Sequence, residues 1–233
     1  MSIEYDSSKA AWDNYVEIYK NSNVLKWFKY NISELKYQNN RYHSYLNDDE
    51  KFKIESPYFK VSGDLIFNFN EKRGHYEYFF KQIKKIDDNK VKNEYINKLE
   101  ICQCCRKPEN TALMITTGGL NNYKNSCKYD RFDVFAYRIK LFFMEEKCEI
   151  GWNVQKGTLM FFFRNKYFNL KKEERIYQFL KDWYLINDKK YADRLIESGE
   201  RRSNISVPDE DDAKCYIDLA LEYWEFRKNK YGG

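Results

Sequence analysis

The scarcity of residues that interrupt regular structure constrains this chain more than any other feature of its sequence. Nine glycines and three prolines occur among 233 residues, about 5% of the chain where proteins average about 12%. Tight turns depend on these two residues, so a many-stranded sandwich or barrel is disfavoured. The scarcity therefore predicts a fold made mainly of helices.

Aromatic side chains supply much of the apolar material, with 21 Tyr, 17 Phe and 5 Trp residues. Because rings carry a large buried area and tyrosine keeps a polar tip, we expect a core of packed rings with hydroxyls at its margin. The alternative is that the rings line a ligand groove, and we favour the core. The length fits a single globular domain over 1–233 that needs no disulfides to fold.

The spacing of apolar residues predicts the elements of this domain. Three- and four-residue spacing predicts helices over 11–19, 35–46, 76–83, 91–101, 130–146, 172–186 and 191–198. Gly199 suits the left-handed position that ends a helix. Alternating apolar residues predict a β-hairpin near 57–70, and the continuous apolar run 159–163 has the length of a strand. We therefore expect an α+β fold in which helix dominates, with one or two small β elements.

A charged stretch interrupts the pattern near the end of the sequence. Residues 200–212 contain two adjacent arginines, a proline and a run of four acidic residues, which predicts a linker. The acidic run favours the N-terminus of a final helix over 213–230, because the helix dipole is positive there.

Charge and composition narrow the class of protein. The 41 basic and 36 acidic residues give a net charge of +5, which is mild for a dedicated nucleic-acid-binding domain. No segment approaches the roughly 18 apolar residues of a membrane span, and the first residues lack the features of a signal peptide. Six cysteines without an export signal indicate reduced thiols. We expect a cytoplasmic protein with no membrane partner, and its many residues with AT-rich codons suggest a low-GC bacterium or its phage.

The cysteines form the first candidate site. Cys102 and Cys105 have the spacing of a zinc knuckle, with Cys104 between them, and Cys127 would add a third ligand. Structural zinc takes four ligands in a tetrahedron, and the fourth would have to come from a distant residue. We favour buried free thiols, and we predict no metal site and no cofactor.

Two further sets of residues are candidates for binding. Gly118 and Gly119 with Lys124 could cradle a phosphate, but their spacing matches no phosphate-binding fingerprint, and we favour an ordinary turn. Arg164 and Lys166 follow three consecutive phenylalanines and mix cations with rings as single-strand binders do. The alternative is that they are surface residues around a core strand.

The start of the 130–146 helix carries the catalytic candidates. Asp130 and Asp133 are three residues apart and thus neighbours on one helix face, where they could hold a divalent ion with Arg138 nearby. The alternative is a capping aspartate with a salt-bridge network that anchors the preceding loop. We favour this alternative, because the dipole alone favours acidic residues at a helix start.

The segment 112–124, with the sequence ALMITTGGLNNYK, and the Asp-Arg-Phe-Asp sequence at 130–133 carry a resemblance. Together they resemble a segment of a family of bacterial proteins without an assigned activity. They are also distantly similar to the Asn-containing region that follows the metal site in HNH-type nucleases of restriction systems. No His-containing metal-binding half precedes the segment here, because His75 lies in an unlike context. The resemblance therefore implies a shared scaffold without nuclease activity.

The absence of a complete catalytic set decides between two classes of function. We favour a non-enzymatic binding protein that engages a protein or a nucleic acid through an aromatic and cationic surface, within a bacterial or phage genome-conflict system. The alternative is a metal-dependent nuclease or another phosphoesterase that uses Asp130 and Asp133. The sequence does not specify the partner or the oligomeric state.

Overall fold

Helices dominate the computed structural model, which describes residues 19, 37–38, 41–42, 61–69, 71, 74–103, 110–115, 120–127, 130–145, 158–205 and 209–231. The helices are α3 (His75–Ile83), α4 (Asn89–Gln103), α5 (Leu120–Ser126), α6 (Phe132–Phe143), α8 (Thr158–Tyr167), α9 (Lys172–Tyr184), α10 (Lys189–Asn204) and α11 (Glu210–Tyr231). The strands are β1 (Tyr37–Gln38), β2 (Arg41–Tyr42), β3 (Val61–Leu65) and β4 (Thr111–Ile115). The predicted helices at 76–83, 91–101, 130–146 and 172–186 are confirmed as α3, α4, α6 and α9.

The hairpin predicted near 57–70 is wrong. β3 pairs antiparallel with β4, with Val61 opposite Ile115 and Leu65 opposite Thr111, so its partner lies beyond α4 in the sequence. The apolar run that follows β3 remains hydrogen-bonded to Asn110, the residue before β4, and enters the core, where Ile66 and Phe67 are fully buried. Residues 66–69 are all buried, and a short apolar run of this kind has the same sequence pattern as a second hairpin strand.

The predicted α+β class is also wrong, because the described strands form only two ribbons of two strands each. Neither ribbon is wide enough to form the sheet layer of an α+β fold. The run 159–163, which has the length of a strand, lies within α8, and a short apolar run carries no period that separates a strand from a buried helix. Residues 37–38 and 41–42 pair as β1 and β2 rather than forming the predicted helix over 35–46. Most of the helix predicted at 11–19 lies outside the described residues.

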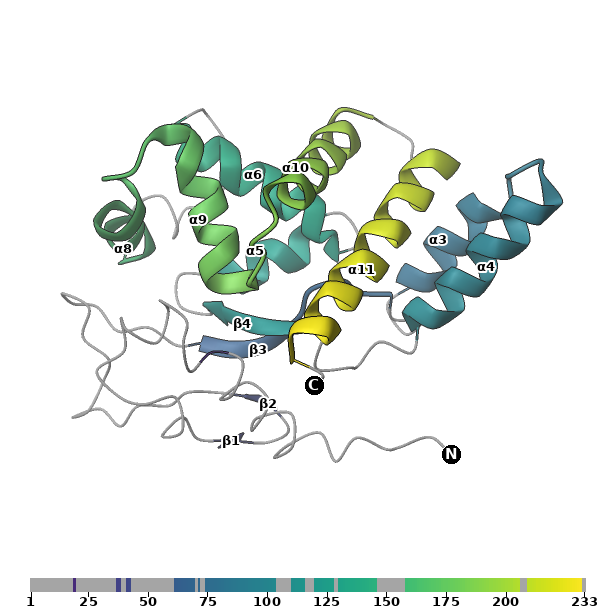
Figure 1. Cartoon of the computed structure of the whole chain (residues 1–233), viewed down its shortest axis with the longest axis horizontal. Coiled ribbons are helices and arrows are strands. Elements are labelled where there is room, and N and C mark those ends of the chain that lie inside the picture. The colour runs from purple at the N-terminus through teal and green to yellow at the C-terminus, as the bar shows by residue number, and fades with distance from the viewer. Residues whose placement is uncertain are drawn as a thin grey trace.

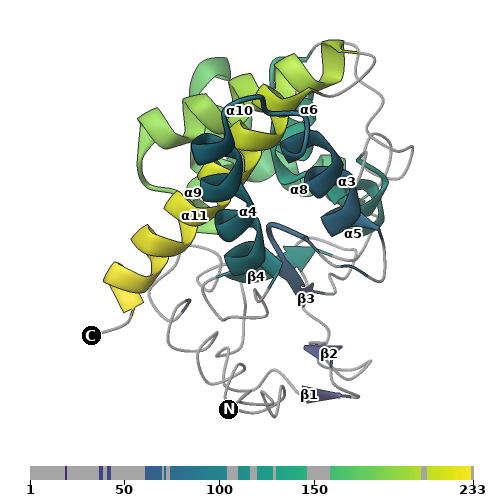
Figure 2. The same ribbon diagram turned by 90° about the vertical axis from the view of Figure 1, so that its right-hand side faces the viewer.

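The helices lie together on one side of the β3–β4 ribbon (Figures 1 and 2). α11 crosses the molecule between the α3–α4 pair and the group that contains α6, α9 and α10 (Figure 1). Tyr216 of α11 stacks on Phe79 of α3 with ring centroids 5.3 Å apart, and it also contacts Phe67 at 5.2 Å. Tyr223 of the same helix packs on Tyr191 of α10 at 6.2 Å, so the rings of α11 join the two groups of helices. No helix in the described ranges is both long and apolar enough to cross a membrane.

Gly199 lies inside α10 and does not end a helix as predicted. α10 continues to Asn204 and α11 begins at Glu210, so the linker predicted over 200–212 is much shorter. A Cβ atom on Gly199 would lie 2.0 Å from the carbonyl oxygen of Asp133. Real Cβ atoms do not approach backbone this closely, so only glycine lets α10 pack directly on the backbone of α6.

Gly199→Ala should lower the free energy of unfolding by about 3 kcal/mol, because the obstructing atoms are backbone and cannot turn aside. At an open helical position the same change would stabilise by about 0.5–1 kcal/mol, so the sign of the effect is diagnostic. Urea unfolding followed by circular dichroism measures it. Glu200→Ala, at the exposed neighbouring position, is the control and should change stability by no more than about 0.5 kcal/mol.

Phe135→Ala should lower the free energy of unfolding by about 3–5 kcal/mol, the usual cost of truncating a buried ring. Phe135 is fully buried in α6 and contacts the rings of Phe132 and Tyr184 at 6.1 Å. The same denaturation experiment applies, with Lys140→Ala on the partly exposed side of α6 as control. A loss below about 0.5 kcal/mol would contradict the assignment of Phe135 to the core.

Candidate functional site

Arg131 occupies the centre of a buried cluster of charges at the start of α6. Its guanidinium is fully buried and donates two hydrogen bonds to Asp133, at 2.9 and 2.5 Å, and two to Asp212, at 2.8 and 3.1 Å. The same guanidinium lies 4.1 Å from the centroid of the Tyr216 ring. Burial alone lowers the pKa of Arg131, but the two carboxylates raise it well above its ordinary value. Arg131 is therefore a charged group held by two bidentate ion pairs.

Three helices contribute to this cluster. Asp133 and Asp212 lie in the first turns of α6 and α11, where the helix dipole favours a carboxylate. Ser198 of α10 donates a hydrogen bond to Oδ2 of Asp133 at 2.7 Å. Arg202 of α10 places its Nε 3.9 Å from Oδ2 of Asp212. Two arginines and two aspartates thus balance one another in charge and tie α6, α10 and α11 together.

Asp130 forms a separate buried pair. Lys124 of α5 donates to its Oδ1 at 2.7 Å, and Asn68 donates to its Oδ2 at 2.8 Å. Asp130 has a φ of 56°, a left-handed conformation that aspartate tolerates, and it precedes α6 without capping it. The N-cap residue is Arg131, which corrects the prediction of a capping aspartate. Lys124, a candidate for the phosphate cradle, is fully buried against Asp130.

The two aspartates considered as metal ligands therefore bind different cations. A metal ion would have to displace Lys124 from Asp130 or Arg131 from Asp133. Arg138 is half-buried further along α6 and donates from Nη1 to the hydroxyl of Tyr123 at 3.3 Å. Within the described ranges no three His, Cys, Asp or Glu side chains gather as a metal site would require. The geometry supports the salt-bridge network and a structural role for the cluster.

The cysteine candidates that the structure describes are buried. Cys102 and Cys127 are fully buried, and the Cys127 thiol donates to the carbonyl of Tyr123 at 3.4 Å. Burial raises the pKa of Cys127 to about 12, so its sulfur carries a proton at neutral pH. Cys104, Cys105, Gly118 and Gly119 lie outside the described residues.

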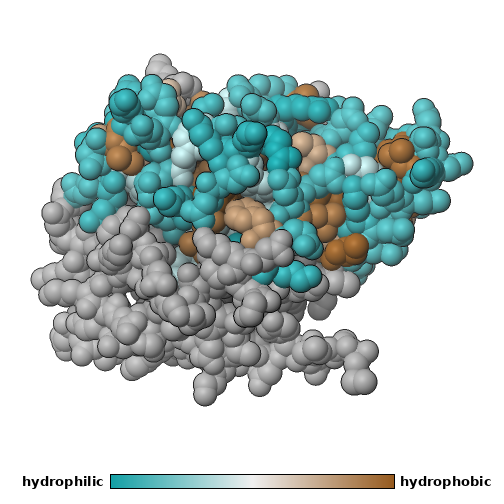
Figure 3. Space-filling view, in the orientation of Figure 1, coloured by the Kyte–Doolittle hydropathy of each residue, from teal (hydrophilic) through white to brown (hydrophobic). Residues whose placement is uncertain are grey.

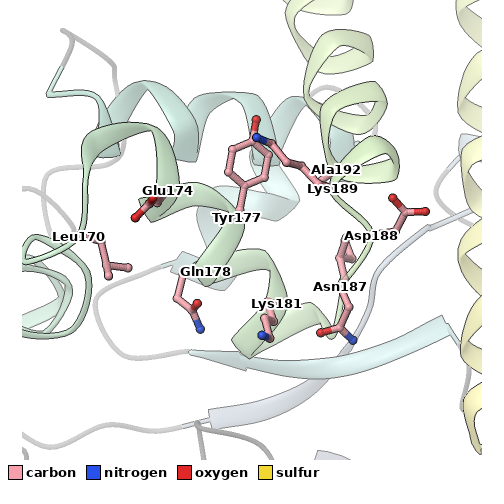
Figure 4. Close-up of a pocket in the computed structure, with 10 residues that line it drawn as sticks. Leu170, Glu174, Tyr177, Gln178, Lys181, Asn187, Asp188, Lys189 and Ala192 are labelled. Carbon is pink, nitrogen blue, oxygen red and sulfur yellow. The ribbon is translucent and has the colours of Figure 1, made fainter.

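An open pocket with a volume of about 300 Å³ lies between α9 and the start of α10. α9 contributes Glu174, Tyr177, Gln178 and Lys181, which share one face of the helix, and the other side carries Asn187 and Lys189 (Figure 4). Apolar atoms of Leu170, Ile186 and Ala192 complete the lining. Sequence analysis missed this pocket, because it depends on how two helices meet. The available signal was Tyr177, whose ring lies outside the helical spacing of Ile176, Phe179, Leu180, Trp183 and Tyr184 that predicts the helix over 172–186.

The turn between α9 and α10 creates the pocket. Leu185 ends α9 in a left-handed conformation with a φ of 59°, which reverses the chain direction within a few residues. Asp188 then begins α10, and its Oδ1 accepts hydrogen bonds from the backbone N–H groups of Lys190 at 2.8 Å and Tyr191 at 3.3 Å. The first turn of α10 is thereby held beside the last turns of α9.

Tyr177 is fixed within the pocket by polar contacts. Its hydroxyl donates to Oδ1 of Asp193, and Lys189 places its Nζ 5.0 Å from the ring centroid. Burial and the Asp193 carboxylate raise the pKa of Tyr177 to about 12, so the hydroxyl is protonated. The pocket therefore presents an oriented ring beside a cation (Figure 4).

Exposed cations lie on α8, at the start of α9 and along it, and at the start of α10, of which α9 and α10 line the pocket. We call this set the basic surface and define it as Arg164, Lys171, Lys172, Lys181, Lys189 and Lys190. Lys172 pairs with Glu145 at 2.9 Å, and the others form no ion pair with a described residue. Arg164, a sequence candidate, is exposed in α8, and its companion Lys166 is half-buried.

Asp212→Ala should lower the free energy of unfolding by about 3–5 kcal/mol, because it leaves the buried charge of Arg131 with one carboxylate instead of two. Asp211→Ala is the matched control. It removes the same charge from the same helix turn, but Asp211 is exposed and pairs only with Lys214 at 2.6 Å, so it should cost less than about 1 kcal/mol. If chemical denaturation shows an equal loss of unfolding free energy for both variants, the stabilising role of the buried Arg131–Asp212 pair is contradicted.

Comparisons with known proteins leave the geometry as the guide to function. No protein-family model, no curated protein and no solved structure matches this chain.

Proposed function

We propose that this protein is a non-enzymatic nucleic-acid-binding protein that contacts its partner through the basic surface and the pocket it surrounds. The observation that carries the proposal is the exposure of the cations of the basic surface, of which Lys172 alone pairs with a described acid. Several cations of α10, α11 and their connection are instead paired, as in Arg194–Glu222, Arg201–Asp209 and Lys214–Asp211. Cations of the basic surface face solvent, and such cations neutralise phosphates. This activity suits a bacterial or phage genome-conflict system.

The buried charges favour binding over catalysis. Asp130 and Asp133, the acids of the nuclease alternative, each contact a buried cation within hydrogen-bonding distance. In the pocket, the carboxylate of Asp188 is engaged as the cap of α10, so Glu174 alone presents an exposed carboxylate there without a described partner. A phosphoesterase needs carboxylates that can hold a metal ion or activate water at an accessible position. The carboxylates of Asp130 and Asp133 are instead engaged in buried ion pairs that stabilise the fold.

The surface favours a phosphate-rich partner over an apolar protein face. The described part of the face in Figure 3 is mainly hydrophilic, with hydrophobic residues in small separate areas. Ile101 is the exposed large hydrophobic residue of the described ranges, at 54% exposure, and it lies on α4, away from the basic surface. Protein interfaces have a core rich in aromatic residues and poor in charge, whereas the basic surface has the opposite composition.

Wild-type protein should bind a fluorescent single-stranded 12-mer at low salt, with an affinity that falls as salt rises. The double variant Lys181→Gln with Lys189→Gln should bind about tenfold more weakly, and the slope of log affinity against log salt should decrease by about 1.4, since each lost phosphate contact on a single strand contributes about 0.7. Fluorescence anisotropy titrations at several salt concentrations measure both quantities.

The matched control is Lys81→Gln with Lys90→Gln, which makes the same change in net charge on α3 and α4, across α11 from the pocket (Figure 1). This control should bind like the wild type. Equal weakening in both double variants would contradict a localised surface. Magnesium-dependent cleavage by the wild type that Asp130→Ala abolishes at unchanged stability would support the nuclease alternative.

A further inference from the structure

We propose that the α9–α10 pocket receives a single unstacked nucleobase that carries an exocyclic amine, which makes the protein a reader of single strands containing cytosine, adenine or guanine. This inference rests on the proposed nucleic-acid binding and specifies the ligand of the same site. Three observations carry it, namely the oriented ring of Tyr177, the hydrogen-bond acceptors of the pocket and the polarity of its charges.

The ring and its apolar neighbours suit a flat aromatic ligand. Tyr177 is held by Asp193, so stacking on it requires little further ordering. Leu170, Ile186 and Ala192 provide apolar contacts around it. Every nucleobase has a π-face, and single-strand binders use aromatic side chains as platforms for successive bases. The volume of about 300 Å³ is at the lower end of ligand pockets, which agrees with one base rather than a larger ligand.

The pocket offers hydrogen-bond acceptors beside the donors of Lys181 and Lys189. Gln178 donates from Nε2 to Asp182 at 2.8 Å, and Asn187 donates from Nδ2 to the carbonyl of Leu185 at 3.3 Å. These contacts engage the amide nitrogens, and neither side-chain carbonyl oxygen accepts a hydrogen bond from a described residue. The exposed carboxylate of Glu174 is a third acceptor. Cytosine, adenine and guanine offer an exocyclic amine to such acceptors. Thymine and uracil carry carbonyl oxygens and have no exocyclic amine.

The two ends of the pocket carry side chains of opposite charge. Glu174 and Lys181 are seven residues apart on one face of α9, roughly 10 Å along the helix axis. Glu174 lies toward Leu170, and Lys181 lies toward Asn187 (Figure 4). A phosphate is repelled at the Glu174 end and attracted by Lys181 at the other end, where the Asp188 carboxylate is engaged as the cap of α10. Lys189 places its Nζ beside the Tyr177 ring (Figure 4). The base therefore directs its amine toward Glu174 and its phosphate toward Lys181.

Anisotropy titrations with labelled 12-mers of deoxycytidine, deoxyadenosine and thymidine test the proposal at one fixed salt concentration. Wild type should bind the cytosine and adenine strands at least fivefold more tightly than the thymine strand. Glu174→Ala should weaken binding of the cytosine strand, leave the thymine strand equal or tighter, and reduce the preference below about twofold. Glu173→Ala is the matched control, because Glu173 is an exposed acid of the same helix turn that does not line the pocket, and it should keep the preference.

Tyr177 gives a second, independent measurement. Tyr177→Leu should weaken binding of the cytosine strand about tenfold through lost stacking, and Tyr177→Phe, which keeps the ring, should retain most of the affinity. Circular dichroism melting of each variant confirms that it is folded. If Tyr177→Leu binds as tightly as wild type, the pocket does not hold a base.

The failures of the two proposals are distinguishable. Three outcomes would overturn the pocket proposal and leave the proposed function standing. Two of them are equal affinity for all three strands and equal effects of Glu174→Ala and Glu173→Ala. The third is equal affinity for a duplex, because a paired base cannot enter the pocket. If no oligonucleotide binds to the wild type at low salt, the proposed function fails and the pocket proposal fails with it.

Discussion

The bidentate contacts of Arg131 with Asp133 and Asp212 hold the start of α6 against the start of α11, and much of the remaining packing depends on that junction. A guanidinium that is fully buried cannot lose a partner without leaving an uncompensated charge in the interior. The same guanidinium lies over Tyr216, whose ring stacks on Phe79 of α3. One side chain therefore orders three helices that are far apart in the sequence.

The position of α10 follows from this junction and in turn determines the pocket. Ser198 donates to Asp133, and the neighbouring Gly199 permits direct contact with the backbone of α6. α9 packs on the same helix through Phe179, whose ring lies 5.6 Å from that of Phe143. Because both walls of the pocket rest on α6, its polar groups keep their relative positions before a ligand arrives, and a preorganised site loses less entropy on binding.

The distribution of charge explains how a chain with a net charge of only +5 can present a basic surface. Inside the protein, the charge of Lys124 balances that of Asp130. The charges of Arg131 and Arg202 balance those of Asp133 and Asp212. On α10, α11 and their connection, Glu222, Asp209 and Asp211 each pair with a cation. The net charge sums all of these groups, whereas a phosphate responds to the charges within about 10 Å of it at 0.1 M salt. Local segregation therefore matters more than the total.

The sequence by itself determined the positions of α3, α4, α6 and α9 and singled out Asp130 and Asp133, but it did not reveal α5 or α8. The periods of α3, α4, α6 and α9 were readable because helix periodicity is a local property of neighbouring residues. The α+β class, the hairpin near 57–70, the strand at 159–163 and the role of Gly199 were predicted wrongly, because strand pairing and helix contact depend on partners distant in the chain. Only the tertiary structure decided that Asp130 and Asp133 bind separate cations and that Leu185 turns α10 back beside α9 to form the pocket, since both outcomes depend on distances between elements that no local pattern records.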